Sequence, residues 1–527
     1  MSTVEGKELG VDDREPVVPC YPPETAARKA LMISEILVLI INHADTRANY
    51  FAHAGSQIHT MTAKDPPWPY MLVCKAWYEI LSSAPSLWTT ILINCGGGYS
   101  RTIHLPSMLD YFLRHSKDMP LTLHISAHII FEDDESRHTL FLNLLGRAFQ
   151  HQHRWEDVRL YLECAEQHSW SFEGRTCVPY DLNLDIERAT MLKRLNIDLP
   201  EDLVFHFPKG NIPRVTLART DNLQYLRLQN VQLLLPNTNP SGILAYFPHL
   251  HSLDLCLIAQ GSHRDLWPLL RASPNIHSLK VDIWDLEDSS ASHSIIPSAS
   301  LNKLHSLIVD FRSLKLLHAL SDRMEVPSLR KLDILHFHLC NNVLSMMANE
   351  LKFHQNPITE LQLDIFLASR SFDENTVAAF FHAFGNLECL RLLSSQHVLL
   401  KSFLVVFAKV LSDPQASEEN MPNVLPRLRT LDLTVSGRVK IFQDDLALSA
   451  YTSIAGDIKK VIMACKRRFP TEFHISIRQE NPFSSRQRVI IEENHVLSLL
   501  DDVDVRRCIT KNFTVSVESE GVAPIAE

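Results

Sequence analysis

The apolar residues in the middle of the chain follow a recurring pattern, in which two residues separate the first apolar pair and one residue separates the second. Nine units carry it: Leu192/Leu195/Ile197, Leu223/Leu226/Leu228, Leu250/Leu253/Leu255, Ile276/Leu279/Val281, Leu304/Leu307/Val309, Leu329/Leu332/Ile334, Ile358/Leu361/Leu363, Leu387/Leu390/Leu392 and Leu428/Leu431/Leu433. Their first positions lie 31, 27, 26, 28, 25, 29, 29 and 41 residues apart. Alternating apolar positions over a few residues are typical of a β-strand, so the pattern predicts nine short strands at regular spacing.

Helix-like stretches lie between the predicted strands, at 314–320, 343–351, 377–384 and 403–411. We therefore expect each repeat to supply one strand and one helix. A single unit of this kind cannot cover its own apolar face, so neighbouring units must stack to form a continuous core. The predicted fold is α/β: a leucine-rich-repeat-like solenoid, with a curved parallel sheet and outer helices.

Two apolar segments near the N-terminus, 31–43 and 70–83, have helical spacing, and the Asp65-Pro66-Pro67 turn separates them. The β-branched segment 87–93 predicts a strand. The expected organisation is a flexible leader (1–28), a small helical motif (29–93), a linker or start of the solenoid (94–150), the solenoid (151–436), a mixed α/β cap (437–517) and a disordered tail (518–527).

Composition narrows the class of partner. The formal charge of -10 and the pI of about 6.2 disfavour a general nucleic-acid-binding role, which depends on clustered Lys and Arg. No apolar run approaches the length of a membrane helix. The ten cysteines form no CxxC pair, which favours reduced thiols and a cytoplasmic or nuclear location. We therefore expect neither a nucleic acid nor a membrane as partner.

Motifs of enzymes and metal sites give no positive signal. His336 and His338 would share one face of an alternating segment and could offer two metal ligands, but no second cluster lies at ligand spacing. The sequence contains no GxSxG, HExxH or phosphate-binding lysine motif. We expect no catalytic residues, no metal and no cofactor.

The segment 70–80, Tyr-Met-Leu-Val-Cys-Lys-Ala-Trp-Tyr-Glu-Ile, followed by Ala-Pro-Ser-Leu-Trp at 84–88, resembles the second half of the F-box and F-box-like motifs of expanded fungal families. These motifs carry a helix with Val-Cys-basic-x-Trp and then Pro-x-Leu-Trp. The segment 32–40 resembles their first half, Leu-Pro-x-Glu-Ile-Leu-x-x-Ile, with Ile33 in place of the proline. The resemblance covers roughly residues 31–93, and degenerate leucine-rich repeats commonly follow such motifs.

The resemblance implies a non-catalytic receptor, whose helical motif docks on a Skp-type adaptor of a cullin-RING ubiquitin ligase while the repeats select a protein substrate. Carried over to this chain, the adaptor-binding candidates are Glu35, Ile36, Leu37, Ile40, Val73, Cys74 and Trp77. The alternative for Leu37, Val73 and Trp77 is that they fill the motif's own small core. Two other functions stay open: a leucine-rich-repeat scaffold without a ligase role, and a hydrolase with a site on the repeat loops.

Residues between the buried leucines should point together toward the concave face of the solenoid, because side chains alternate along a strand. One such row is Arg227, Asp254, Lys280, Ile308, Asp333, Gln362, Arg391 and Asp432; two positions further on, Asp282, Asp310, Asp364 and Thr434 continue the face. The surplus of aspartates suggests a basic or mixed-charge partner segment. The alternative is a set of merely solvated polar positions.

Overall fold

The computed structural model describes residues 29, 31, 33–44, 67–95, 104–129, 135–164, 183–199, 213–218, 220–234, 247–257, 263–283, 299–310, 320–322, 324–349, 357–368, 371–394, 397–412, 425–436, 446–469, 473–480, 503–509 and 513–520. They form two compact units. The smaller unit contains the N-terminal helices, and the larger contains the sheet. The predicted leader 1–28, the loop at 46–64 and most of the predicted helix 314–320 lie outside the described residues.

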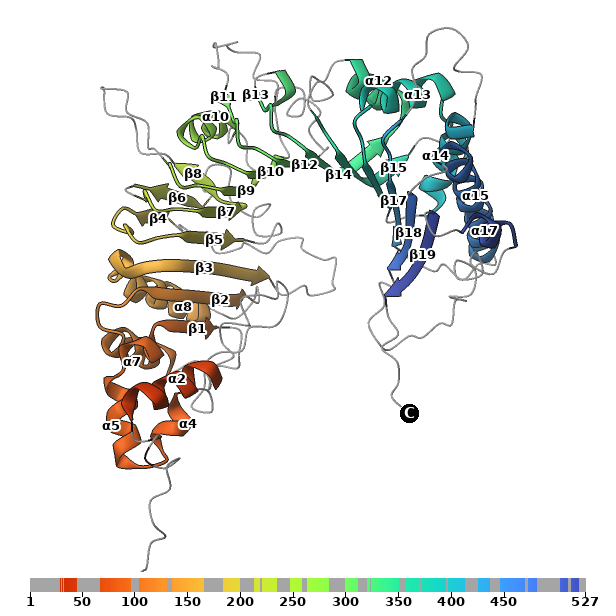
Figure 1. The fold of residues 1–527 in the computed structure, drawn as a ribbon. Helices are drawn as coiled ribbons and strands as arrows, with labels where there is room; N and C mark the ends of the chain where they lie inside the picture. The colour runs from red at the N-terminus through yellow and green to blue at the C-terminus, as the bar shows by residue number, and fades with distance from the viewer. Residues whose placement is uncertain are drawn as a thin grey trace, which may run out of the picture. The chain divides into compact units, whose positions relative to one another are not determined.

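A 14-stranded sheet organises the larger unit (Figure 1). In spatial order its strands are β1 (Thr90–Asn94), β2 (Leu121–Ile129), β3 (Trp155–Cys164), β5 (Arg194–Asp198), β7 (Tyr225–Gln229), β9 (Ser252–Leu257), β10 (Ser278–Ile283), β12 (Ser306–Asp310), β14 (Lys331–Leu339), β15 (Glu360–Ala368), β16 (Cys389–Ser394), β17 (Thr430–Ser436), β18 (Phe473–Glu480) and β19 (Phe513–Glu520). Spatial order therefore follows chain order throughout. All pairings from β2 to β19 are parallel.

Each of the nine repeated units supplies one strand, from β5 to β17, so residues 192–433 contain the parallel array that their spacing predicts. The register places equivalent leucines opposite one another, as at Leu226, Leu253 and Leu279. All apolar residues of the nine units are buried, with at most 3% of any of them exposed. Burial of one such side chain stabilises a fold by about 1.5–3 kcal/mol, so this apolar ridge is the main source of stability in the sheet.

The sheet is wider than the predicted solenoid. β1 and β2 join it before residue 151, and β18 and β19 continue it after residue 436 with unbroken register. The repeat period fails there because the connections are longer, while the strands still alternate apolar and polar residues. β19 runs to Glu520, so the expected disordered tail at 518–527 was wrong for its first three residues.

After the N-terminal helices, the described residues form further helices, some of which pack against the large sheet. In chain order they are α7 (Leu105–His115), α8 (Glu135–Phe149), η2 (Gln152–Arg154), α10 (His263–Ala272), α12 (Asn341–Asn349), α13 (Glu374–Ala383), α14 (His397–Ser412), α15 (Leu446–Arg468) and α17 (Val503–Cys508). α12 packs against β14, and α14 packs against β15 and β16. Three of the four predicted inter-strand helices correspond to α12, α13 and α14.

Short strands outside the large sheet occur in several of the repeats up to β14. β4 (Asn183–Ile186), β6 (Arg214–Leu217) and β8 (Gln232–Leu234) form a parallel three-stranded sheet, and β11 (Ala299–Ser300) pairs with β13 (Met324–Glu325). In β4 and β6 every second residue is buried and the residues between them are exposed or half-buried. This period of two is typical of a β-strand. In the described residues of these repeats, the chain between the sheet's strands thus contributes additional short strands, which the sequence pattern did not predict.

The smaller unit contains α2 (Ser34–Ala44), α4 (Trp68–Met71), α5 (Lys75–Ser83), the short helix η1 (Pro85–Trp88) and the C-terminal half of α7. The expected helix 70–83 is broken at residues 72–74, where Cys74 takes an extended conformation. The apolar spacing continues through residues 72–74, so the sequence pattern gives no sign of this break. The strand expected from residue 87 begins only at Thr90, because Pro85 starts a helical turn.

Candidate protein-binding surfaces

Aromatic packing holds the smaller unit together. Trp88 is fully buried, and its ring lies 5.3 Å from that of Trp68 and 5.1 Å from that of Phe112. Its indole Nε1 donates a hydrogen bond to the carbonyl oxygen of Leu81 (3.0 Å), which fixes η1 against the end of α5. Leu37 of α2 is fully buried as well, and α2 packs against α5 and η1. Ile41, Met71 and Leu81 are buried as well, whereas other apolar residues of the two segments lie at the surface.

An exposed apolar surface remains on α2 and at the break between α4 and α5. We define the apolar docking surface as Ile33 (48% exposed), Ile36 (37%), Leu39 (68%), Ile40 (46%), Leu72 (85%) and Val73 (59%). Exposed large apolar side chains on one small unit are typical of protein-interaction sites. The surface includes Ile36, Ile40 and Val73, three of the residues that the F-box resemblance makes candidates for adaptor binding.

The other four candidate adaptor-binding residues have different environments. Leu37 lies in the core, which favours the alternative role for this residue. Trp77 is half-buried, and its ring lies 6.5 Å from that of Tyr70. Glu35 and Cys74 are exposed; a hydrogen bond from the backbone of Glu35 and one from the Ser34 hydroxyl lower the pKa of the Glu35 carboxyl. The spacing of apolar residues did not indicate the exposure of Leu39, because apolar residues lie on both faces of α2, or that of Leu72, because it lies at the break between α4 and α5.

The second candidate surface is the polar side of the sheet, between and beside the buried leucines. The register confirms the predicted row, because consecutive members pair in the order Arg227, Asp254, Lys280, Ile308, Asp333, Gln362, Arg391 and Asp432. We call this the central polar row. A partner lying across the sheet would meet one of its side chains on each strand from β7 to β17.

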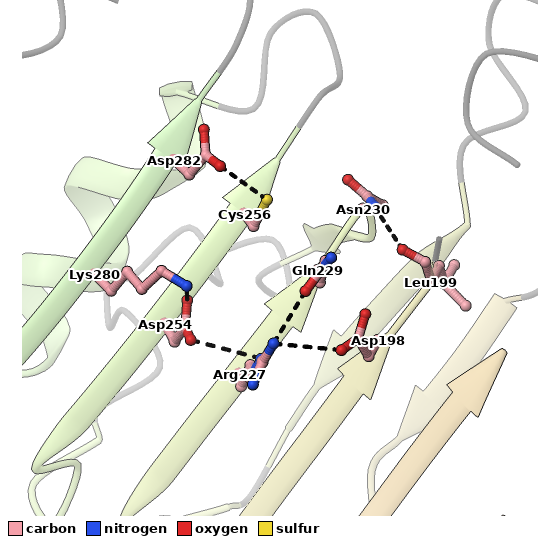
Figure 2. Close-up of polar contacts among 9 residues, drawn as sticks. All are labelled: Asp198, Leu199, Arg227, Gln229, Asn230, Asp254, Cys256, Lys280 and Asp282. Atoms are coloured by element: carbon pink, nitrogen blue, oxygen red, sulfur yellow. Dashed lines mark hydrogen bonds and ion pairs between the residues drawn. The ribbon is translucent and has the colours of Figure 1, made fainter. Parts of the chain in front are cut away.

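Charges at the start of the central polar row alternate in sign and bind one another (Figure 2). Arg227 lies between two carboxylates, with Nη2 3.3 Å from Asp198 Oδ2 and Nε 3.6 Å from Asp254 Oδ2. The amine of Lys280 lies 3.5 Å from the other oxygen of Asp254. Arg227 also donates to the amide oxygen of Gln229 (3.1 Å). We call Asp198, Arg227, Asp254 and Lys280 the charge ladder; its two positive and two negative charges neutralise one another.

Burial raises the pKa values of three aspartates on the polar side of the sheet. Removal from water raises the pKa of the Asp198 carboxyl to about 6, and the neighbouring Arg227 offsets this effect only in part. Burial also raises the pKa values of Asp333 and Asp364. Ionisation of these carboxyls at neutral pH therefore costs free energy. Nearby positive side chains, such as Arg227 beside Asp198 and Lys331 beside Asp333, reduce this cost.

Three of the candidate aspartates on the polar side of the sheet are buried. The alternative interpretation, that these positions are simply polar residues exposed to solvent, was therefore wrong for them. Asp282, Asp310 and Asp333 are 8%, 1% and 4% exposed. The thiol of Cys256 donates to Asp282 (3.3 Å), as Figure 2 shows, and the Nδ1 atom of His336 lies 2.5 Å from Asp310.

Further along the sheet, charged members of the row have partners of opposite sign. Lys331 lies 3.0 Å from Asp333, and Arg391 donates to Asp432 (3.1 Å). The half-buried Asp364 lies two positions beyond Gln362 on β15. The charged side chains on this part of the polar side are thus paired with opposite charges. An aromatic residue lies among them: Phe366 is 50% exposed, and its ring lies 5.8 Å from that of His336.

One turn residue makes a hydrogen bond that the repeat pattern did not indicate. The asparagine usual in leucine-rich repeats is absent at the expected place three residues after the last strand leucine, which is Val231 in the second unit. Asn230, one position earlier, has a φ of 60° and donates from its side chain to the carbonyl oxygen of Leu199 in the preceding unit. Asparagine tolerates this left-handed backbone better than most residues, which explains its place here.

Among the described residues, no three metal-capable side chains come together, and no helix has the length and apolar character to cross a lipid bilayer. Comparison of the chain with models of protein families finds no match, and comparison with curated proteins finds none either.

Proposed function

We propose that this chain is an F-box-like substrate receptor, a non-catalytic protein that links a protein substrate to a Skp-cullin-RING ubiquitin ligase. The apolar docking surface binds the Skp-type adaptor, and the polar side of the sheet holds the substrate. The F-box-like motif and the leucine-rich-repeat solenoid are part of this proposal. The observation that carries it is the exposure of Ile36, Ile40 and Val73, which are the positions that the F-box resemblance assigns to adaptor contact.

Energetics support a binding role for this surface. Burying one exposed isoleucine or valine against a partner is worth about 1.5–3 kcal/mol, so a few of them supply much of the affinity of a helix-in-groove complex. The core beneath them, formed by Leu37 and Trp88, presents these side chains on a fixed scaffold. For the sheet, parallel strands in chain order support a repeat solenoid, and its polar side offers side chains to a partner on every strand.

Direct binding to a purified Skp-type adaptor, measured by calorimetry with the full chain, tests the proposal. We expect wild-type protein to bind, and the double variant Ile36→Ser with Val73→Ser to bind at least tenfold more weakly, because neither serine can replace the apolar packing against the adaptor. Met191→Ser is the matched control, since Met191 is an exposed apolar residue (38%) of the larger unit.

Two results would contradict parts of the proposal. Absence of adaptor binding by the folded wild-type chain would favour the scaffold function without a ligase role. Unchanged binding by the double variant would show that the adaptor contacts other residues. Circular dichroism of each variant separates a weakened interface from an unfolded protein, with Leu37→Ala as an example of a core substitution that destabilises the small unit.

A further inference from the structure

Three histidines occupy equivalent positions at the start of neighbouring strands. His251, His277 and His305 directly precede β9, β10 and β12, and each begins a His-Ser-Leu tripeptide. The serines of these tripeptides pair in register, so the histidines before them lie side by side along one edge of the sheet. Ring centroids are 5.2 Å apart for the first pair and 5.7 Å for the second, whose rings are parallel. We call these three residues the histidine row.

Hydrogen bonds fix two of the rings and leave one nitrogen of each for solvent or a partner. The Nδ1 atom of His277 lies 2.7 Å from the carbonyl oxygen of Asn275, and that of His305 lies 2.5 Å from the carbonyl oxygen of Lys303. A carbonyl only accepts, so Nδ1 donates and Nε2 carries the lone pair of the neutral ring. All three histidines are exposed. Nε2 can therefore gain a proton without breaking these bonds, and imidazole is the side chain that changes charge between pH 5 and 8.

The charged groups around the histidine row are basic. Burial and then the nearby His277, His249 and Lys303 lower the pKa of His251, and no carboxylate is among the groups of the described chain that act on it. Arg330 holds the equivalent position before β14, and its backbone N–H donates to the carbonyl oxygen of His305 (3.0 Å).

The flanking positions carry no competing acid. Gln224 before β7 and Thr359 before β15 hold the places on either side of this stretch. The nearest aspartates of the central polar row belong to other ion pairs: Asp254 with Arg227 and Lys280, and Asp333 with Lys331. Protonation would thus create a strip of up to five positive charges, from the histidine row, Lys303 and Arg330.

We propose that the histidine row, together with Lys303 and Arg330, binds an acidic peptide segment of a partner protein at mildly acidic pH and releases it as the histidines lose their protons. Charge complementarity selects this occupant, because with the histidines protonated the strip carries positive charge only. Carboxylates of an extended segment can follow the row, since neighbouring strands lie about 4.8 Å apart. The inference is independent of adaptor docking through the smaller unit.

Fluorescence anisotropy of a labelled twelve-residue peptide of alternating Asp and Glu, titrated with the full chain at low salt, tests this inference. Wild-type protein should bind about tenfold more tightly at pH 5.5 than at pH 7.5. At pH 5.5 the triple variant His251→Gln/His277→Gln/His305→Gln should lose about tenfold in affinity, which is about 1.4 kcal/mol. His382→Gln, at an exposed histidine of α13, is the matched control and should behave as wild type.

A second triple variant, with lysine at the same three positions, separates charge from local structure. It should bind the acidic peptide at both pH values, because lysine stays charged. A peptide of alternating Asn and Gln should not bind any of the proteins. Failure of wild-type protein to bind at pH 5.5, or equal binding by the glutamine triple variant, would overturn the inference, whatever the result of the adaptor experiment.

Discussion

Replacing Asp198 with asparagine should change how the stability of the larger unit depends on pH. The carboxyl of Asp198 is 15% exposed, and its pKa rises from 3.8 to about 6 on folding. A carboxyl with a raised pKa binds its proton more tightly in the folded state, so it favours folding at low pH and loses this contribution as the pH rises through about 6. Asparagine has no such titration.

The magnitude follows from these two pKa values. Each unit of difference corresponds to 1.36 kcal/mol, and the linkage relation gives an ionisation cost of about 1 kcal/mol at pH 4.5 and about 3 kcal/mol at pH 7.5 for wild-type protein. The free energy of unfolding of Asp198→Asn, relative to wild type, should therefore rise by about 2 kcal/mol between pH 4.5 and 7.5. The attraction of Arg227 adds nothing further to this difference, because it acts only on ionised Asp198 and is already contained in the folded-state pKa of about 6.

Urea unfolding followed by circular dichroism, at half-unit pH steps from 4.5 to 7.5, measures this difference. Gln229→Glu is unsuitable as a control because it adds a charge to the ladder, whereas Asp185→Asn changes an exposed aspartate of β4 and should leave the pH profile unchanged. Parallel pH profiles for wild type and Asp198→Asn would refute the reasoning, since they would mean that Asp198 titrates alike in the folded and unfolded chains.

Two further predictions concern hydrogen bonds. Trp88→Phe should destabilise the smaller unit by about 1–3 kcal/mol more than Trp68→Phe in thermal unfolding, because Trp88 donates to Leu81 whereas the buried Nε1 of Trp68 has no acceptor among the described residues; equal losses would contradict this. Asn230→Gly should cost about 1 kcal/mol, the worth of its bond to Leu199, and Asn230→Ala about 1 kcal/mol more because of the positive φ; urea unfolding that ranked alanine above glycine would count against this account.

The repeat spacing was enough to predict the parallel sheet, because one short apolar motif defines each strand and its neighbours bury it. The register of the central polar row followed from the same alternation, as the pairing of Arg227 with Asp254 and of Arg391 with Asp432 illustrates. Burial on the polar side could not be predicted in this way. Asp310 is covered through a contact with His336, which lies at a bulge of β14 with a φ of 48°, and nothing in the apolar spacing indicates a bulge.

Other differences arose where local geometry outweighed periodicity. The helix expected at 70–83 is interrupted by the extended Cys74, although apolar spacing runs on through it. The outer strands β4 and β6 are too short for a period of 2 to be distinguished from part of a helical turn. The histidine row had a visible signal, three His-Ser-Leu tripeptides in consecutive units, but its meaning depends on the register that brings the rings together.

Because the strands of the large sheet lie in chain order, the width of the sheet depends on the number of repeats. Every strand exchanges backbone hydrogen bonds only with the repeats before and after it, so gain or loss of one whole repeat would move everything beyond it by one strand spacing, about 4.8 Å. Pairing within the remaining repeats would be unaffected. The number of repeats therefore sets the width of the sheet, and this width can change by whole repeats without redesign of any single strand.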